Sequence, residues 1–133
     1  MSGNRLPVAM LVEALASILA AAARLKTSSF EQLVPTSQVD GATGISKAEA
    51  SQIERAIDGW ARRLPGKPAC FIQGLAATAM LRRRGYLATL HYGSRRGDAG
   101  LEAHVWVSSG GEPVIGHRNA DQFAELSLFP SSG

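Results

Sequence analysis

Apolar residues recur at helical spacing through the first two-thirds of the chain. One stripe over residues 7–26 repeats every three or four positions and predicts an amphipathic helix. Its members are Leu11, Leu15, Ile18, Ala22 and Leu25. Two further helices are expected over residues 46–64 and 69–84, and Ser46 and Glu49 fit a capping box at the start of the first of these. A polar connector with one short helical turn over residues 29–33 separates the first two helices.

From Tyr86 onward the pattern changes to alternation of apolar and polar residues, which is typical of strands. Four strands are expected, over residues 86–92, 101–108, 112–115 and 123–129. Residues 93–100 are interpreted as a charged loop and residues 109–111 as a hairpin turn. Helices followed by a small antiparallel sheet indicate the α+β class.

The single cysteine lies where chemistry is expected. Cys70 opens the helix over residues 69–84, after a breaker run at 64–69 that holds two prolines and a glycine. Unpaired amides and the helix dipole at this position favour a thiolate, so we expect a pKa below the ordinary value of about 8.5. The same amides can receive an oxyanion. The alternative interpretation is a buried core cysteine, because free cysteine is among the most buried residue types.

His104 lies on the strand over residues 101–108, later in the chain than the cysteine. A thiol at a helix N-terminus and an imidazole on a following strand form the layout of a cysteine nucleophile with its general base. Alternation places His104 and Trp106 on one face of the strand and Val105 and Val107 on the aliphatic core face. The end of the Cys70 helix is a candidate to pack on the His104 face. A structural histidine is the alternative.

Composition narrows the classes of protein that fit. The chain has 133 residues, 45% of them hydrophobic and 19% charged, which is typical of one globular domain. The net charge of +3 comes from scattered basic residues, so no nucleic-acid surface is expected. One cysteine cannot form an internal disulfide, which favours a cytoplasmic location. Glu13 interrupts the apolar N-terminal helix, so we expect neither a signal peptide nor stable membrane insertion.

The remaining polar residues suggest no metal or other cofactor. His91 and His117 lack metal-ligand spacing with a cysteine or an acidic cluster. The arginines at 82–84 are interpreted as complementing the dipole at a helix C-terminus. Arg95 and Arg96 lie in the expected charged loop, where they are candidates to bind an acidic peptide; the alternative is a solvated loop without a partner.

Two sequence blocks carry a family resemblance. One begins at Cys70 and ends with Arg82-Arg83-Arg84-Gly85, and the other is Ala103-His104-Val105-Trp106-Val107. With their surroundings, over residues 50–128, they resemble the leader peptidases of lasso-peptide biosynthesis, which are cysteine proteases of the transglutaminase-like superfamily. The resemblance implies a transglutaminase-like, papain-like core with Cys70 as nucleophile and His104 as base.

The resemblance also implies substrates and partners. Such an enzyme removes the leader from a ribosomally made precursor peptide, which a separate leader-recognition protein delivers, and an ATP-dependent cyclase then closes the ring. Residues 1–45 are interpreted as an N-terminal helix and connector that are a candidate docking segment, and residues 46–133 as the catalytic domain. Trp106, Arg95 and Arg96 are candidate substrate-binding residues. The alternatives are a transglutaminase or acyltransferase, and a leader-binding module without catalysis.

The third catalytic residue departs from the family pattern. Members carry an Asp about twelve positions after the histidine, where this chain has Gly116 followed by His117. The nearest acid downstream is Asp121, which we take as the candidate third member; Asn119 is a neutral substitute, and Glu112 lies nearer the preceding turn. A third residue orients the imidazole and stabilises its charged form.

Overall fold

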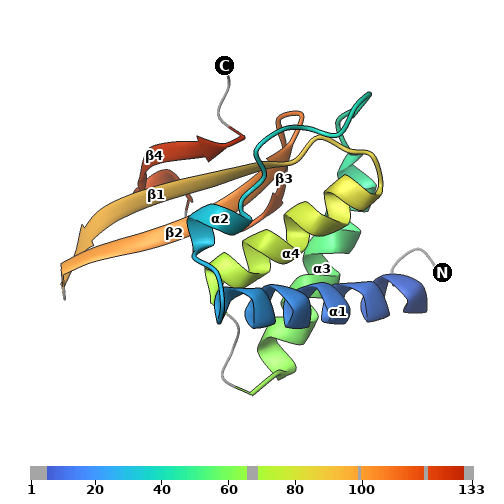
Figure 1. Cartoon of the computed structure of the whole chain (residues 1–133), viewed down its shortest axis with the longest axis horizontal. Coiled ribbons are helices and arrows are strands. Elements are labelled where there is room, and N and C mark those ends of the chain that lie inside the picture. Colours follow the sequence, from blue (N-terminus) through green and yellow to red (C-terminus); the bar gives the residue numbers. More distant parts are fainter. Residues whose placement is uncertain (1–5, 66–68, 99, 119, 131–133) are drawn as a thin grey trace.

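The computed structural model confirms the α+β class: helices come first and an antiparallel sheet follows (Figure 1). The structure describes residues 6–65, 69–98, 100–118 and 120–130. The helices are α1 Val8–Leu25, α2 Phe30–Leu33, α3 Lys47–Arg63 and α4 Cys70–Arg83. The strands are β1 Thr89–Gly97, β2 Gly100–Ser109, β3 Glu112–Ile115 and β4 Ala124–Phe129, and a single 3₁₀ turn, η2 Ala120–Gln122, precedes β4.

The four strands form one antiparallel sheet in the order β3-β2-β1-β4. β1 and β2 make a long hairpin that pairs continuously from Thr89 opposite Ser108 to Gly97 opposite Gly100. The expected charged loop over residues 93–100 is therefore wrong for residues 93–97, which continue β1. Polarity alone suggested a loop, but β2 supplies hydrogen-bond partners along this whole segment, and Arg95 pairs with the opposite Glu102 at 2.7 Å.

The main core lies between the helices and one face of the sheet (Figure 1). The largest fully buried side chains there come from α1, α3, α4 and three strands: Ile18, Ile53, Ile57, Met80, Leu81, Leu90, Val105, Val107 and Val114. Gly74 lets α4 approach β2 closely, because a Cβ at Gly74 would lie 2.6 Å from Cγ1 of Val105. Close contact between α4 and the Val105 face of β2 follows from this glycine.

The N-terminal helix α1 packs on α3 and α4. Ala14 and Ile18 are buried in the common core, and the Trp60 indole N–H donates to the Leu11 carbonyl at 2.8 Å. Val12 and Leu19 remain exposed on the other side. By length and a mean hydropathy of 1.9, α1 is long and apolar enough to cross a membrane, a test that core helices of soluble proteins also pass. The boundary expected at residue 45 and the absence of membrane insertion stay predictions.

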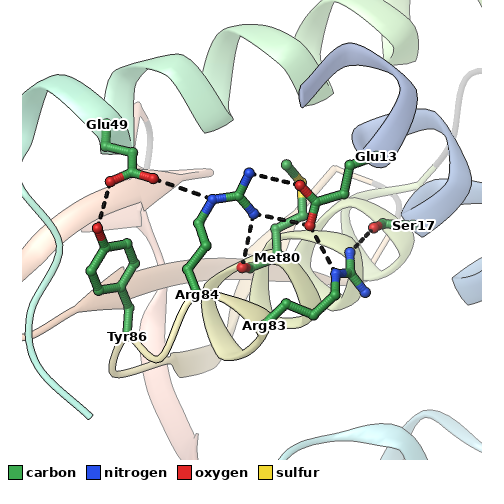
Figure 2. Close-up of polar contacts among 7 residues, drawn as sticks. All are labelled: Glu13, Ser17, Glu49, Met80, Arg83, Arg84 and Tyr86. Carbon is green, nitrogen blue, oxygen red and sulfur yellow. Dashed lines mark hydrogen bonds and ion pairs between the residues drawn. The ribbon is translucent and has the colours of Figure 1, made fainter. Parts of the chain in front are cut away.

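Ion pairs join the C-terminal end of α4 to α1 and α3 (Figure 2). Arg84 contacts Glu13 of α1 at 2.7 Å and Glu49 of α3 at 3.2 Å, while Arg83 contacts Glu13 at 2.8 Å. The Tyr86 hydroxyl donates to Glu49 at 2.5 Å. This segment was interpreted only as complementing a helix dipole, and the structure adds that Arg84 is largely buried, its side chain 23% exposed.

The capping box expected for α3 is half formed. The Ser46 hydroxyl accepts a hydrogen bond from the Glu49 backbone N–H at 3.2 Å, as predicted. The Glu49 carboxylate contacts Tyr86 and Arg84, whereas the full box would direct it back to the Ser46 backbone. The Glu49 carboxylate, which the capping box would have used, is therefore engaged in a tertiary ion pair instead.

Candidate active site

Cys70 is the first residue of α4, as the sequence predicted. Ala69 precedes it in an extended conformation and makes no side-chain cap. The backbone N–H groups of the first helical turn are therefore left for other acceptors. The run Pro65-Gly66-Lys67-Pro68, which was expected to present the cysteine, falls mainly on residues 66–68, and these lie outside the described part of the chain.

Burial raises the pKa of the Cys70 thiol above its ordinary value, although hydrogen bonds from the backbone N–H groups of Val105, Phe71 and Cys70 favour the thiolate. The expected lowering of this pKa is therefore wrong. The sequence showed the helix N-terminus but not the desolvation, and the desolvation is the larger effect. The thiol rests protonated at neutral pH, so attack by its sulfur requires a base.

His104 lies on β2 with its ring held on two sides and at one nitrogen. Its ring centroid lies 5.8 Å from that of Trp106 in a stacked arrangement and 5.0 Å from that of Phe123. Its Nε2 lies 2.7 Å from the carbonyl oxygen of Gly116. These contacts fix both the plane of the imidazole and the direction of one of its nitrogens.

The predicted alternation along β2 is confirmed, but α4 packs on the Val105 face. His104 lies on the other face with Trp106, so the expectation that the cysteine helix covers this face is wrong. The thiol instead meets the strand at its backbone, at the N–H of Val105.

The thiol and the imidazole reach the same edge of β2. β3 ends at Ile115, which pairs with Val107, so the backbone of Val105 lies beyond the end of β3. Gly116 lies at that edge, because a Cβ built on it would be 2.7 Å from the Val105 carbonyl oxygen. Cys70 hydrogen-bonds to Val105 there, and the imidazole of the preceding residue hydrogen-bonds to Gly116. The arrangement brings a thiol and an imidazole to the same edge of the strand.

The candidates for the third catalytic residue lie at different places. Asp121 lies in η2 and is exposed. Glu112 pairs with Ser109 at the β2–β3 turn, and Asn119 lies outside the described residues. His117 Nε2 donates to the Val107 carbonyl at 2.8 Å, and burial lowers the pKa of this imidazole. The assignment of Asp121 stays a prediction.

The candidate substrate-binding residues make contacts within the chain. Arg95 donates to Glu102 at 2.7 Å and to Gln122, and its guanidinium lies 4.6 Å from the ring centroid of Phe123. Arg96 is exposed on β1. Trp106 is buried, 7% exposed, and stacks on His104. Their roles in substrate binding stay predictions.

Phe123 is a further residue of the site. The sequence marks it as the start of an expected strand and as part of the segment that carries the resemblance, but neither signal predicts its contact with the histidine. Phe123 links His104 to Arg95, since its ring contacts both side chains. The sequence also showed no sign of an apolar pocket of about 330 Å³. Phe71, the residue after Cys70, lines this pocket. Its lining residues are Phe30, Phe71, Tyr92, Ser127 and Phe129. They come from segments far apart in the chain, so periodicity could not group them.

His91 lies on the same face of the sheet as His104. Its Nδ1 lies 2.7 Å from Glu125, its Nε2 lies 2.8 Å from the Ser108 hydroxyl, and its ring stacks on Trp106 at 5.4 Å. Over the residues that the structure describes, no group of three or more His, Cys, Asp or Glu side chains is placed to hold a metal ion.

Comparison with known proteins indicates the family of the chain. A family model described as the transglutaminase-like superfamily matches residues 6–128, which includes α1 as well as the segment with Cys70 and His104. Neither a curated protein nor a solved structure matches the chain. Cysteine peptidases and acyltransferases are common in this superfamily. The chain belongs to the transglutaminase-like superfamily.

Proposed function

We propose that the protein is a cysteine peptidase that removes the leader peptide from a ribosomally synthesised lasso-peptide precursor. The observation that supports the peptidase chemistry is that the Cys70 thiol, at the N–H of Val105, and the His104 imidazole, at the Gly116 carbonyl, lie along the same edge of β2. The choice of substrate is supported by the resemblance of the Cys70 and His104 blocks to leader peptidases. The superfamily match supports a thiol enzyme at the coarser level.

In the first half of the reaction His104 accepts the thiol proton. Its Nε2 is engaged by Gly116, so Nδ1 is the nitrogen that takes the proton. The Cys70 sulfur attacks the scissile carbonyl carbon, and the carbonyl π electrons move to oxygen. The N–H groups of Cys70 and Phe71 at the start of α4 stabilise that oxyanion. When the C–N bond breaks, His104 returns the proton to the leaving amine, and a thioester remains on Cys70.

In the second half, water replaces the amine. His104 takes one proton from the water as its oxygen attacks the thioester carbonyl carbon. The C–S bond then breaks, and the proton returns to the Cys70 sulfur. The products are the leader with a free carboxyl group and the core peptide with a free amine. Because the thiol rests protonated, transfer of its proton to His104 accompanies attack.

The proposal includes two partners and a location. A separate leader-recognition protein delivers the precursor, and an ATP-dependent cyclase uses the amine that cleavage frees. The recognition protein docks on the outward apolar side of α1, where Val8, Val12 and Leu19 are 74%, 61% and 54% exposed. The double substitution Val12→Glu and Leu19→Glu places two negative charges on this face. Calorimetric titration should show that it raises the Kd for the recognition protein at least tenfold. Unchanged affinity would contradict docking at this face. The protein acts in the cytoplasm.

Mass spectrometry of a cleavage reaction tests the function. The purified protein is incubated with a lasso precursor and its recognition protein, beside a Cys70→Ala variant as the matched control. The expected result is cleavage at one bond that is lost in the control. An amine conjugate in place of the free acid, when a primary amine is supplied, would indicate an acyltransferase. Tight leader binding without cleavage by a folded protein would indicate a binding module.

A further inference from the structure

The hydrogen bond between His104 and Gly116 identifies which imidazole nitrogen carries the proton. The Nε2 atom lies 2.7 Å from the Gly116 carbonyl oxygen. A carbonyl oxygen has no proton to donate, so Nε2 must be the donor. In the neutral imidazole the other nitrogen, Nδ1, then has a free lone pair. This is the tautomer that a general base needs if it accepts a thiol proton at Nδ1.

The backbone conformation of Gly116 directs this carbonyl toward His104. Gly116 has a φ of +80°, in the left-handed region that favours glycine. A Cβ there would lie 2.7 Å from the Val105 carbonyl oxygen and 3.0 Å from the Trp106 Cα. Both the φ value and the surrounding backbone therefore disfavour any other residue. Gly116 lies at the edge where Cys70 also contacts Val105.

The carbonyl lies at the sequence position where the resemblance places an aspartate. Gly116 has no side chain to orient the histidine, but its carbonyl dipole accepts from Nε2. Trp106 and Phe123 hold the ring from its sides, with centroids at 5.8 and 5.0 Å. The backbone thus supplies orientation without a negative charge.

We propose that the Gly116 carbonyl is the positioning group of His104 and replaces the acidic third residue of the site. Its catalytic meaning rests on the proposed function, because it sets the tautomer in which His104 takes the proton of Cys70. Gly116 does not contact the substrate in this proposal. It holds the base in one orientation and one tautomer.

Nuclear magnetic resonance of the full-length protein tests this inference without an activity assay. In ¹⁵N- and ¹³C-labelled protein, the neutral His104 ring should show the Nε2–H tautomer. A scalar coupling across the hydrogen bond should connect Nε2 to the carbonyl carbon of Gly116. A neutral ring protonated at Nδ1 would overturn the proposal. Failure of the cleavage assay alone would contradict the proposed function and leave this result standing.

A pair of glycine variants tests the effect on catalysis. Gly116→Ala forces the backbone from its φ of +80° and displaces the carbonyl, whereas Gly111→Ala has a similar strain at φ +88° with open space around its Cβ. Gly116→Ala should lower kcat about 10²-fold relative to Gly111→Ala, with KM little changed, because misplacement of a catalytic group by about 1 Å has that effect. The Nε2–H signal of His104 should change only in Gly116→Ala.

Two results would assign the orienting role elsewhere. Equal kcat in folded Gly116→Ala and Gly111→Ala would show that the carbonyl is not needed. A 10²-fold loss of kcat in Asp121→Asn, without a loss in Gly116→Ala, would assign the role to the acid. If Gly116→Ala does not fold, the tautomer and the coupling in the unsubstituted protein still decide the question.

Discussion

The two ends of α4 differ in how their charges and backbone groups are satisfied. At the C-terminal end, Arg83 and Arg84 contact Glu13 and Glu49 from two other helices (Figure 2). At the N-terminal end, the cap residue Ala69 makes no side-chain hydrogen bond, and the N–H groups of Cys70 and Phe71 hydrogen-bond to the Cys70 sulfur. The ion pairs at the C-terminal end hold α4 against the other helices, whereas the N-terminal end keeps backbone N–H groups available as hydrogen-bond donors.

The comparison shows how a small domain separates stability from reactivity. A helix N-terminus without a cap loses stabilisation of about 1 kcal/mol. The contacts at the other end, together with the close packing of Gly74 on Val105, hold the same helix in place. Changes at the two ends should therefore affect different measured quantities.

The largest expected effect comes from removing the proposed nucleophile. Cys70→Ala should lower turnover about 10⁴-fold or more, because a member of a catalytic pair is lost. Its free energy of unfolding should change by less than about 1 kcal/mol, since the thiol is small and only partly buried. Urea unfolding beside the cleavage assay measures both. If Cys70→Ala lost as much unfolding free energy as Glu13→Ala, the two ends of α4 would not separate reactivity from stability.

Removal of the shared carboxylate at the other end should affect stability. Glu13→Ala leaves Arg83 and Arg84 without a partner they both contact, and Glu13 and Arg84 are each 23% exposed. We expect a loss of about 2 kcal/mol in urea unfolding, below the value for a fully buried pair. The kcat of the folded fraction should remain that of the unsubstituted protein.

The matched control for this variant is an exposed ion pair. Asp58 and Arg62 lie 3.2 Å apart on α3, with side chains 52% and 74% exposed. Asp58→Ala should cost no more than about 0.5 kcal/mol, because water screens such pairs. An equal loss in Glu13→Ala and Asp58→Ala would show that the cluster at the end of α4 adds little stability.

Acid should weaken the same cluster. Burial opposes ionisation of Glu13, but hydrogen bonds and charges from Arg84 and Arg83 outweigh it and lower the pKa of this carboxyl below 4.5. The unfolded chain therefore binds the proton first as pH falls, so the stabilisation is full above pH 4.5 and is lost as pH falls through the folded pKa. The difference in unfolding free energy between the protein and Glu13→Gln should shrink over that range. A difference independent of pH would contradict this.

The smallest effect concerns the rate at which the resting thiol is alkylated. Because burial raises the pKa of Cys70, its thiolate fraction at neutral pH should be lower in the folded chain than in the unfolded one. Iodoacetamide labelling measured against pH should have its midpoint above 9.0 in the folded protein. The urea-unfolded chain provides the reference. Faster labelling of the folded chain at neutral pH would instead indicate a preformed thiolate.

Local patterns predicted the elements whose signals are contained within a few neighbouring residues. The cap at Ser46, the apolar stripe of α3 and the alternation in β2 are such signals, and all three are present in the structure. Arg95 and Arg96 were placed in a loop because charged residues lower the expectation of a strand. The pairing of β1 with β2 overrides that preference. This pairing depends on residues of the opposite strand, which a local pattern does not include.

Periodicity and residue type are properties of the chain alone, and they were enough to predict the α+β class and the candidate thiol and imidazole. The folded arrangement was needed to show that the thiol is desolvated, that α4 lies on the Val105 face and that His104 contacts the Gly116 carbonyl. Desolvation depends on neighbours brought from elsewhere in the chain. Every residue has a backbone carbonyl, so residue type cannot show which one meets the imidazole.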